Sequence, residues 1–102
     1  MNEEKVKLKF IWDEKKNRRN ISKHGVSFEQ AAEVFDDIYA VKLFDEEHSE
    51  DEERFYLIGR DLNERQLTVC HCYRGENEDI IRIISARKAN QSEIEFYWRN
   101  KL

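Results

Sequence analysis

The sequence predicts an α+β fold in a single domain spanning residues 1–102, with two N-terminal helices and a C-terminal helix packed on one face of an antiparallel β-sheet. Three observations predict this class. Strand-like segments follow one another in the second half of the chain, separated by connectors of hairpin length. Apolar residues recur at helical spacing before and after them. A length of 102 residues suits one domain with one hydrophobic core.

The first part of the chain predicts a strand followed by a helix. Segment 6–12 alternates apolar residues with lysines, which is typical of a half-buried strand. Asp13 suits a helix N-cap. A short polar helix over 14–23 is expected to end at His24, because Gly25 can adopt the left-handed conformation that follows many helices.

A second helix is predicted to begin at Ser27, which can form a capping box with Gln30. Its expected buried stripe consists of Phe28, Ala31, Ala32, Phe35 and Ile38. Residues 40–44 predict a short strand, and the acidic run 45–53 that follows predicts a loop.

Three further strands are predicted over residues 54–60, 66–74 and 80–88. The last contains four isoleucines, which indicates a strand that is buried on much of both faces and central in the sheet. Asn90 and Glu93 can cap a C-terminal helix. Its expected buried stripe consists of Ile94, Tyr97, Trp98 and Leu102.

The net charge of −4 is unevenly distributed along the chain. Residues 27–53 carry eleven acidic side chains and one basic one, whereas residues 1–24 carry eight basic and four acidic ones. The overall acidity therefore says little about any single face of the protein. No apolar run approaches the length of a membrane span and the chain does not start like an export signal, so we expect a cytoplasmic protein.

The sequence gives only weak signals for a metal or cofactor, and we expect none. Cys70 and Cys72 share one face of a predicted strand, which disfavours a mutual disulfide and indicates free thiols. A zinc site that combines them with His48 or His71 would lack a second matching pair of ligands. The acidic run could bind a divalent cation, but such loops are usually solvated, and a basic partner protein suits this one better.

Hairpin pairing predicts which residues share a face of the sheet. It sets Arg60 opposite Gln66 and Arg74 opposite Ile80. One face then gathers the core residues Phe55, Leu57, Leu67, Val69, Ile81 and Ile83. The other face gathers Arg54, Tyr56, Arg60, Thr68, Cys70, Cys72, Arg74, Arg82 and Lys88, with Arg54, Cys72 and Arg82 side by side. In this register His71, Ser85 and Arg87 point to the core side, although a one-residue bulge would reverse part of the assignment.

Clustered arginines repel one another, and a bound anion would relieve that cost. We therefore expect this face to bind phosphate, with Tyr56 able to stack on a base. The alternative is that Glu50, Glu52 or Glu53 of the acidic loop neutralises the arginines internally.

Several short motifs, taken in order and spacing, resemble the BrnT family of bacterial type II toxins. They are Trp12-Asp13, Lys23 to Glu29, Ala32 with Phe35 to Asp37, Asp45 with His48, Glu53-Arg54, Ile58 to Arg60, and Arg82 to Arg87. The resemblance runs from about Phe10 to Tyr97, nearly the whole chain.

This resemblance implies a RelE-like ribonuclease fold and metal-independent cleavage of RNA that inhibits translation and growth. It also implies a cognate antitoxin, BrnA, with a ribbon-helix-helix part that binds DNA. The antitoxin would cover the toxin in a heterotetramer of two copies each (2:2) and repress their shared operon. Only the antitoxin would contact the operator DNA.

Metal-free cleavage by attack of a 2′-hydroxyl on the adjacent phosphate needs a base, an acid and cations. We expect catalytic roles for His24, Arg60, Arg74, Arg82 and Arg87, and RNA binding by Lys23, Arg54, Tyr56 and Lys88. His24 is the candidate for proton transfer, although a histidine at a helix C-terminus can instead stabilise helix carbonyls. Arg87 fits the family motif, yet its register suggests a rim or structural arginine. The alternative function is a non-catalytic component of a repressor complex, whose basic face takes an acidic antitoxin segment.

Overall fold

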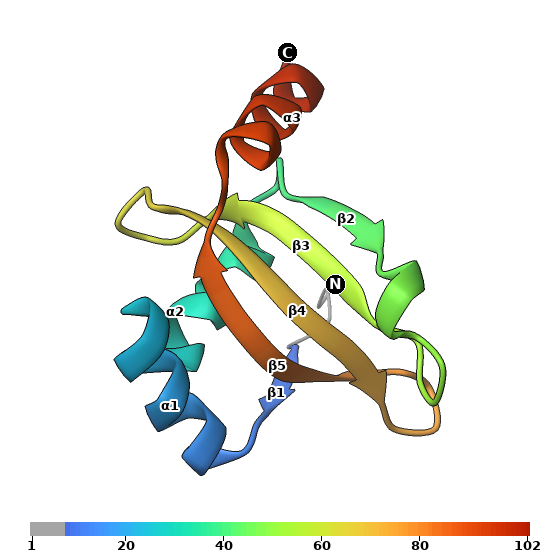
Figure 1. Cartoon of the computed structure of the whole chain (residues 1–102). Helices are drawn as coiled ribbons and strands as arrows, with labels where there is room; N and C mark the ends of the chain where they lie inside the picture. The colour runs from blue at the N-terminus through green and yellow to red at the C-terminus, as the bar shows by residue number, and fades with distance from the viewer. Residues whose placement is uncertain (1–7) are drawn as a thin grey trace, which may run out of the picture.

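A computed structural model describes residues 8–102 of the chain. Its centre is a five-stranded sheet in the order β1-β5-β4-β3-β2 (Figure 1). The strands are β1 (Lys9–Ile11), β2 (Val41–Phe44), β3 (Phe55–Arg60), β4 (Gln66–Arg74) and β5 (Ile80–Lys88). The predicted start of the first strand, residues 6 and 7, lies outside the described residues.

The sheet is mixed, so the prediction of a wholly antiparallel sheet is wrong at one edge. Strands β3, β4 and β5 pair antiparallel, as their hairpin-length connectors require, and β2 also pairs antiparallel with β3. Strand β1 pairs parallel with β5, with Lys9 opposite Ile80 and Ile11 opposite Arg82. No hairpin constrains this pair, because the whole chain between residues 11 and 80 lies between its two strands.

Three α-helices complete the fold: α1 (Glu14–His24), α2 (Phe28–Glu33) and α3 (Gln91–Lys101). Their predicted caps are confirmed: Asp13, Ser27 and Asn90 each accept a hydrogen bond from the first turn of the helix that follows. Two 3-10 turns, η1 (Val34–Asp36) and η2 (Glu46–His48), follow α2 and β2. Because the helix tightens into η1, Ile38 falls outside it and is 87% exposed instead of joining the buried stripe.

The core lies between one face of the sheet and α2 with η1. It consists of Val26, Phe28, Ala31, Val34, Leu57, Leu67, Val69, Ile81, Ile83 and Ala86. His71 also points to this side and is completely buried, as predicted. Burial lowers its pKa to about 4, with a smaller effect of Lys42 in the same direction, so the imidazole is neutral at pH 7.

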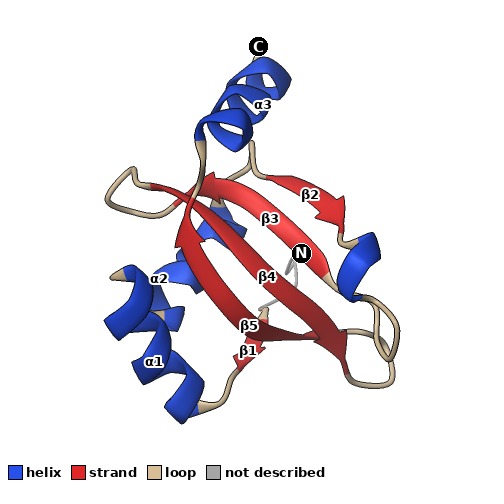
Figure 2. Cartoon of the chain, viewed as in Figure 1, coloured by secondary structure: helices blue, strands red, loops and turns tan. Residues whose placement is uncertain are grey.

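Helix α3 does not pack beside the other two helices, so the prediction of three helices on one face is wrong. It stands at one end of the sheet, away from α1 and α2 (Figure 2). Its Phe96 lines a small hollow with Ile58, whose side chain points away from the core of Leu57. Tyr97 is fully buried and donates a hydrogen bond to Asp37 at 2.8 Å, whereas Trp98 and Leu102 of the predicted stripe are exposed.

A β-bulge between β4 and β5 corrects the predicted faces. The register shifts between Cys70 and His71, and this leaves Ile84 as the extra residue. Beyond the bulge, Ser85 lies opposite Cys70 and Arg87 opposite Thr68, so both lie on the face away from the core and not on the core side. Lys88 lies opposite the buried Leu67, on the core side, and not with the other basic residues.

We call the sheet face opposite the core the outer face. Its members include Tyr56, Ile58, Arg60, Thr68, Cys70, Cys72, Arg74, Arg82, Ser85 and Arg87. The predicted pairs Arg60 with Gln66, Arg74 with Ile80, and Cys72 with Arg82 are all confirmed. Cys70 and Cys72 are free thiols, also as predicted.

The side chain of Asn20 replaces a strand at the edge of β5. Strand β1 ends opposite Arg82, which leaves the backbone of Ala86 without a neighbouring strand on that side. Asn20 Nδ2 donates to the Ala86 carbonyl at 2.7 Å, and Asn20 Oδ1 accepts from the Ala86 amide at 3.1 Å. Asn20 Nδ2 also donates to the carbonyl of Val26 at 2.8 Å. Because Asn20 is 6% exposed, these bonds hold α1 firmly against β5.

Within residues 8–102, no helix is both long and apolar enough to cross a membrane.

Candidate nucleic-acid interface

A basic groove of about 190 Å³ lies along the contact between α1 and β5. Four basic or titratable side chains of α1 line it, together with Asn20 and the bulge region of β5: Lys16, Arg19, Lys23, His24, Ile84 and Ser85. The α1 residues recur every three or four positions, which places them on one face of the helix. Among residues 8–102, no carboxylate lines this groove. The groove therefore presents a surface that attracts anions.

The groove unites the two site residues that were predicted on the first helix. Lys23 and His24 occupy its last turn, and Gly25 ends the helix with φ +69°, a conformation that residues with a Cβ rarely adopt. His24 is half-buried there and lies beside Ser85 of β5 in the groove lining. Lys23 and His24 also lie at the helix C-terminus, where the helix dipole favours positive charge.

A second basic cluster, the arginine row, lies at the other end of the outer face and consists of Arg54, Arg74 and Arg82. Arg82 lies opposite Cys72, and both Arg74 and Arg82 are close enough to lower the pKa of that thiol, although its burial and Glu52 raise it more. Arg54 immediately precedes β3 and Arg74 ends β4. The predicted grouping of these three arginines is thus observed.

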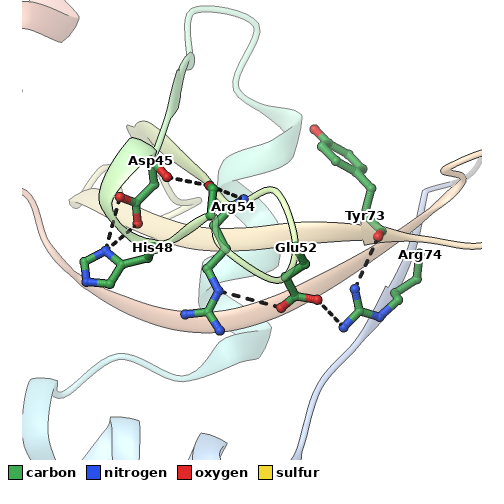
Figure 3. Close-up of polar contacts among 7 residues, drawn as sticks. Asp45, His48, Glu52, Arg54, Tyr73 and Arg74 are labelled. Carbon is green, nitrogen blue, oxygen red and sulfur yellow. Dashed lines mark hydrogen bonds and ion pairs between the residues drawn. The ribbon is translucent and has the colours of Figure 1, made fainter.

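Glu52 of the acidic loop lies between Arg54 and Arg74 of the arginine row (Figure 3). Its carboxylate lies 2.6 Å from a terminal nitrogen of Arg74 and 3.6 Å from Nε of Arg54. The hydrogen bond from Arg74 lowers the pKa of Glu52, so the carboxylate stays charged at neutral pH. The expected alternative, neutralisation by the acidic loop, therefore applies to two of the three arginines. Arg82 has no carboxylate within 4.0 Å among residues 8–102.

An uncharged strip connects the basic groove with the arginine row. Its members Ser85, Cys70 and Tyr56 are cross-strand neighbours on β5, β4 and β3. Burial, followed by the nearby Asp45 carboxylate, raises the pKa of Tyr56 to about 12. Burial also raises the pKa of the Cys70 thiol, so both groups keep their protons at pH 7.

Arg87 and Arg60 lie on or near the outer face, but both are engaged by α3. Arg87 donates two hydrogen bonds to Glu93, at 2.7 and 3.0 Å, and this pairing raises the pKa of Arg87. Arg60 lies over the ring of Trp98, 5.3 Å from its centroid, and its backbone amide donates to Asp37. Arg60 also lies at the opposite end of β3 from Arg54. Together with Lys88 on the core side, these residues are not brought into the basic groove or the arginine row.

A histidine–aspartate pair, His48 and Asp45, lies at the margin of the arginine row and was not among the predicted site residues. His48 Nδ1 lies 2.9 Å and 3.2 Å from the two carboxylate oxygens of Asp45, which is 5% exposed. Lys16 and Arg19 of the basic groove are absent from the predicted site residues, and Ser85 was predicted on the core side. The spacing Asp-x-x-His in a loop was a sequence signal from which the pair could have been predicted. The groove could not be predicted in this way, because it forms only where α1 meets the bulge of β5.

No group of three or more histidine, cysteine, aspartate or glutamate side chains within residues 8–102 is arranged to hold a metal ion.

Two of three comparisons with known proteins found similar proteins. A comparison with curated proteins found no match. The crystal structure of the Brucella abortus ribonuclease toxin BrnT, determined at 1.1 Å resolution, is similar to this chain with a TM-score of 0.64 and 28% sequence identity. That similarity covers 83% of this chain and 100% of the Brucella chain. Residues 12–93 match the family described as the ribonuclease toxin, BrnT, of type II toxin-antitoxin systems. The chain therefore belongs to the BrnT family of type II ribonuclease toxins.

Proposed function

We propose that this chain is a metal-independent endoribonuclease that cleaves RNA by attack of a 2′-hydroxyl on the adjacent phosphate and thereby inhibits translation and growth in the cytoplasm. The observation that carries the proposal is the basic groove, because it combines four cationic or titratable side chains with no lining carboxylate in the described chain. Membership of a ribonuclease toxin family supports the same reaction class.

The RNA strand runs from the basic groove across the uncharged strip to the arginine row. Lys23 binds a phosphate in the groove, and Tyr56 offers a ring for base stacking midway. Arg82 stabilises the charge that develops on the phosphorane, because its guanidinium can hold two phosphate oxygens and stays charged. Arg54 and Arg74 join it once Glu52 is displaced. His24 lines the groove beside Lys23, while Arg60 and Arg87 support the site through α3.

The partner that we propose is a BrnA-like antitoxin with a ribbon-helix-helix part, which covers the toxin in a 2:2 heterotetramer and alone contacts operator DNA. Membership of a type II toxin family supports an antitoxin partner. The acidic segment 27–53 supports a basic contact surface on that partner. Light scattering of the co-purified complex measures the stoichiometry directly.

The function is tested by expression of the chain alone and with its neighbouring gene product, followed by an RNA cleavage assay in EDTA. We expect growth arrest and EDTA-resistant cleavage that is lost in Arg82→Ala and weakened in Lys23→Ala. Arg18→Ala is the matched control, because Arg18 is an exposed α1 cation that does not line the groove. A folded protein that leaves RNA intact at several pH values would refute the proposal.

A non-catalytic, partner-binding component of a repressor complex is the second candidate function. The position of Glu52 favours it, because a carboxylate from an acidic antitoxin segment would bind Arg54 and Arg74 in the same way. Tight antitoxin binding by a chain that neither arrests growth nor cleaves RNA would establish this function instead.

A further inference from the structure

We propose that His48 accepts the proton of the attacking 2′-hydroxyl and that Asp45 is its positioning residue. The inference rests on the proposed ribonuclease function and assigns the base that this reaction needs. It differs from the expectation from the sequence, which gave proton transfer to His24.

Asp45 is fixed in place by the backbone around it. Its amide donates to the carbonyl of Arg54 at 2.8 Å, and the hydroxyl of Ser49 donates to the carbonyl of Asp45. The amide of Arg54 in turn donates to the Ser49 hydroxyl at 3.0 Å. These bonds tie both ends of the η2 turn to the start of β3. The carboxylate is thus held rigidly at the point where it meets His48.

The contact with Asp45 selects one tautomer of His48. An ionised carboxylate can only accept hydrogen bonds, so the imidazole nitrogen that faces it, Nδ1, carries the proton. The neutral ring then has its lone pair on Nε2. Because the His48 side chain is 56% exposed, Nε2 is accessible to a substrate. An oriented and accessible imidazole with a buried carboxylate behind it is the arrangement that a general base requires.

Arg54 provides an anion site next to this imidazole. His48 and Arg54 line the same hollow, of about 520 Å³, which is large enough for a nucleotide. The Nε–H of Arg54 is buried and makes no hydrogen bond within the described part of the chain, because Glu52 lies beyond hydrogen-bond distance at 3.6 Å. A phosphate that replaces Glu52 there would satisfy this donor and place the neighbouring ribose near His48.

The charged groups around His48 come from the acidic run 45–53 and from the start of β3. Asp45 and Glu47 precede His48, Glu50, Asp51 and Glu52 follow it, and Arg54 leads into β3. Tyr56 of β3 adjoins Asp45 on the other side. The acidic groups repel an approaching phosphate until the phosphate displaces Glu52 from Arg54. Cleavage therefore depends on that displacement.

The chemical step needs no additional reactant. The 2′-hydroxyl proton moves to Nε2 of His48 while the bond from O2′ to phosphorus forms and the bond from phosphorus to O5′ breaks. The leaving O5′ takes a proton from water, and the imidazolium returns its proton to solvent. The products are a 2′,3′-cyclic phosphate and a 5′-hydroxyl end.

The test measures single-turnover cleavage of single-stranded RNA in EDTA by the purified full chain, together with the affinity for a non-cleavable 2′-O-methyl RNA. We expect His48→Gln to lower the cleavage rate by about 100-fold or more, as loss of a general base does, with affinity changed less than about twofold. Glu46→Gln, in the same turn but outside the hollow, is the control that keeps the wild-type rate. Added imidazole should restore part of the rate of His48→Ala.

Asp45→Asn distinguishes a positioning role from a structural one. It should slow cleavage and move the acidic limb of the pH–rate profile, while His48→Gln should remove that limb. Cleavage by His48→Gln at the wild-type rate, with Arg82→Ala inactive, overturns this inference and leaves the proposed function intact. A larger rate loss in His24→Gln than in His48→Gln also overturns it. A wild-type chain that cleaves no RNA refutes both proposals together.

Discussion

Replacement of Glu52 by glutamine should increase the affinity of this protein for RNA. The Glu52 carboxylate holds Arg74 and Arg54 in the positions where phosphate oxygens would bind them. Glutamine keeps the size of the side chain but removes its charge, so both guanidinium groups become available to phosphate. The substitution should therefore strengthen RNA binding, whereas most substitutions at a binding surface weaken it.

The size of the gain follows from the exposure of the ion pairs. The side chains of Arg74 and Arg54 are 41% and 35% exposed, and solvent therefore screens both pairs substantially. Exposed pairs contribute about 0.2–1 kcal/mol each, so the two together are worth about 1 kcal/mol. Since each 1.4 kcal/mol corresponds to a tenfold change in affinity, RNA binding should tighten about fivefold. Contact with one or two additional phosphates should also steepen the logarithmic salt dependence by about 0.7 for each phosphate.

Fluorescence anisotropy with a 2′-O-methyl RNA at several salt concentrations measures both effects without cleavage. Glu46→Gln is the matched control, because it removes the same charge from the same loop and Glu46 forms no ion pair within residues 8–102. Equal affinities and equal salt slopes for the two variants would show that Glu52 does not compete with RNA for Arg54 and Arg74.

Three predictions concern stability. Arg87→Ala should lower the melting temperature by about 5 °C and by more than Arg82→Ala, because only Arg87 ties the sheet to Glu93 of α3; equal or reversed losses in circular dichroism would contradict this. Between about pH 6.5 and pH 4, the unfolded state binds a proton on His71 that burial excludes from the folded state, so the free energy of unfolding of the wild type should fall by about 3 kcal/mol as the pH decreases. In His71→Phe, urea denaturation should show a flatter pH dependence over this range. Asn20→Ala should cost about 2–4 kcal/mol in urea denaturation, because it leaves buried backbone groups unpaired, and a loss below 1 kcal/mol would argue against its role as a substitute strand.

Local signals were sufficient for much of this fold. The caps at Asp13, Ser27 and Asn90 depend on residues within one helical turn, and all three were predicted. The pairing of Arg60 with Gln66 depends only on connector length, and it also was predicted. The parallel pairing of β1 could not be predicted, because alternation identifies a strand without identifying its neighbour.

The candidate site was harder to predict because it depends on one inserted residue. The four isoleucines of β5 are apolar on both faces, so their sequence contains no alternation that would reveal the bulge at Ile84. That bulge moves Ser85 and Arg87 to the outer face and Lys88 away from it. Lys23, which was expected to bind RNA, lies in the basic groove together with other basic residues of α1.

The bonds between Asn20 and Ala86 determine when the basic groove can form during synthesis of the chain. They join residues 66 positions apart, and the parallel pair of β1 and β5 closes a similar span of chain. Contacts so distant in sequence form late in folding, because a long loop must close before they contribute stability. The basic groove has one wall on α1 and the other on β5, so it cannot exist while the ribosome still holds the C-terminal strand. A nascent or truncated chain without β5 therefore lacks the basic groove, and under the proposed function its activity first arises in a nearly complete chain.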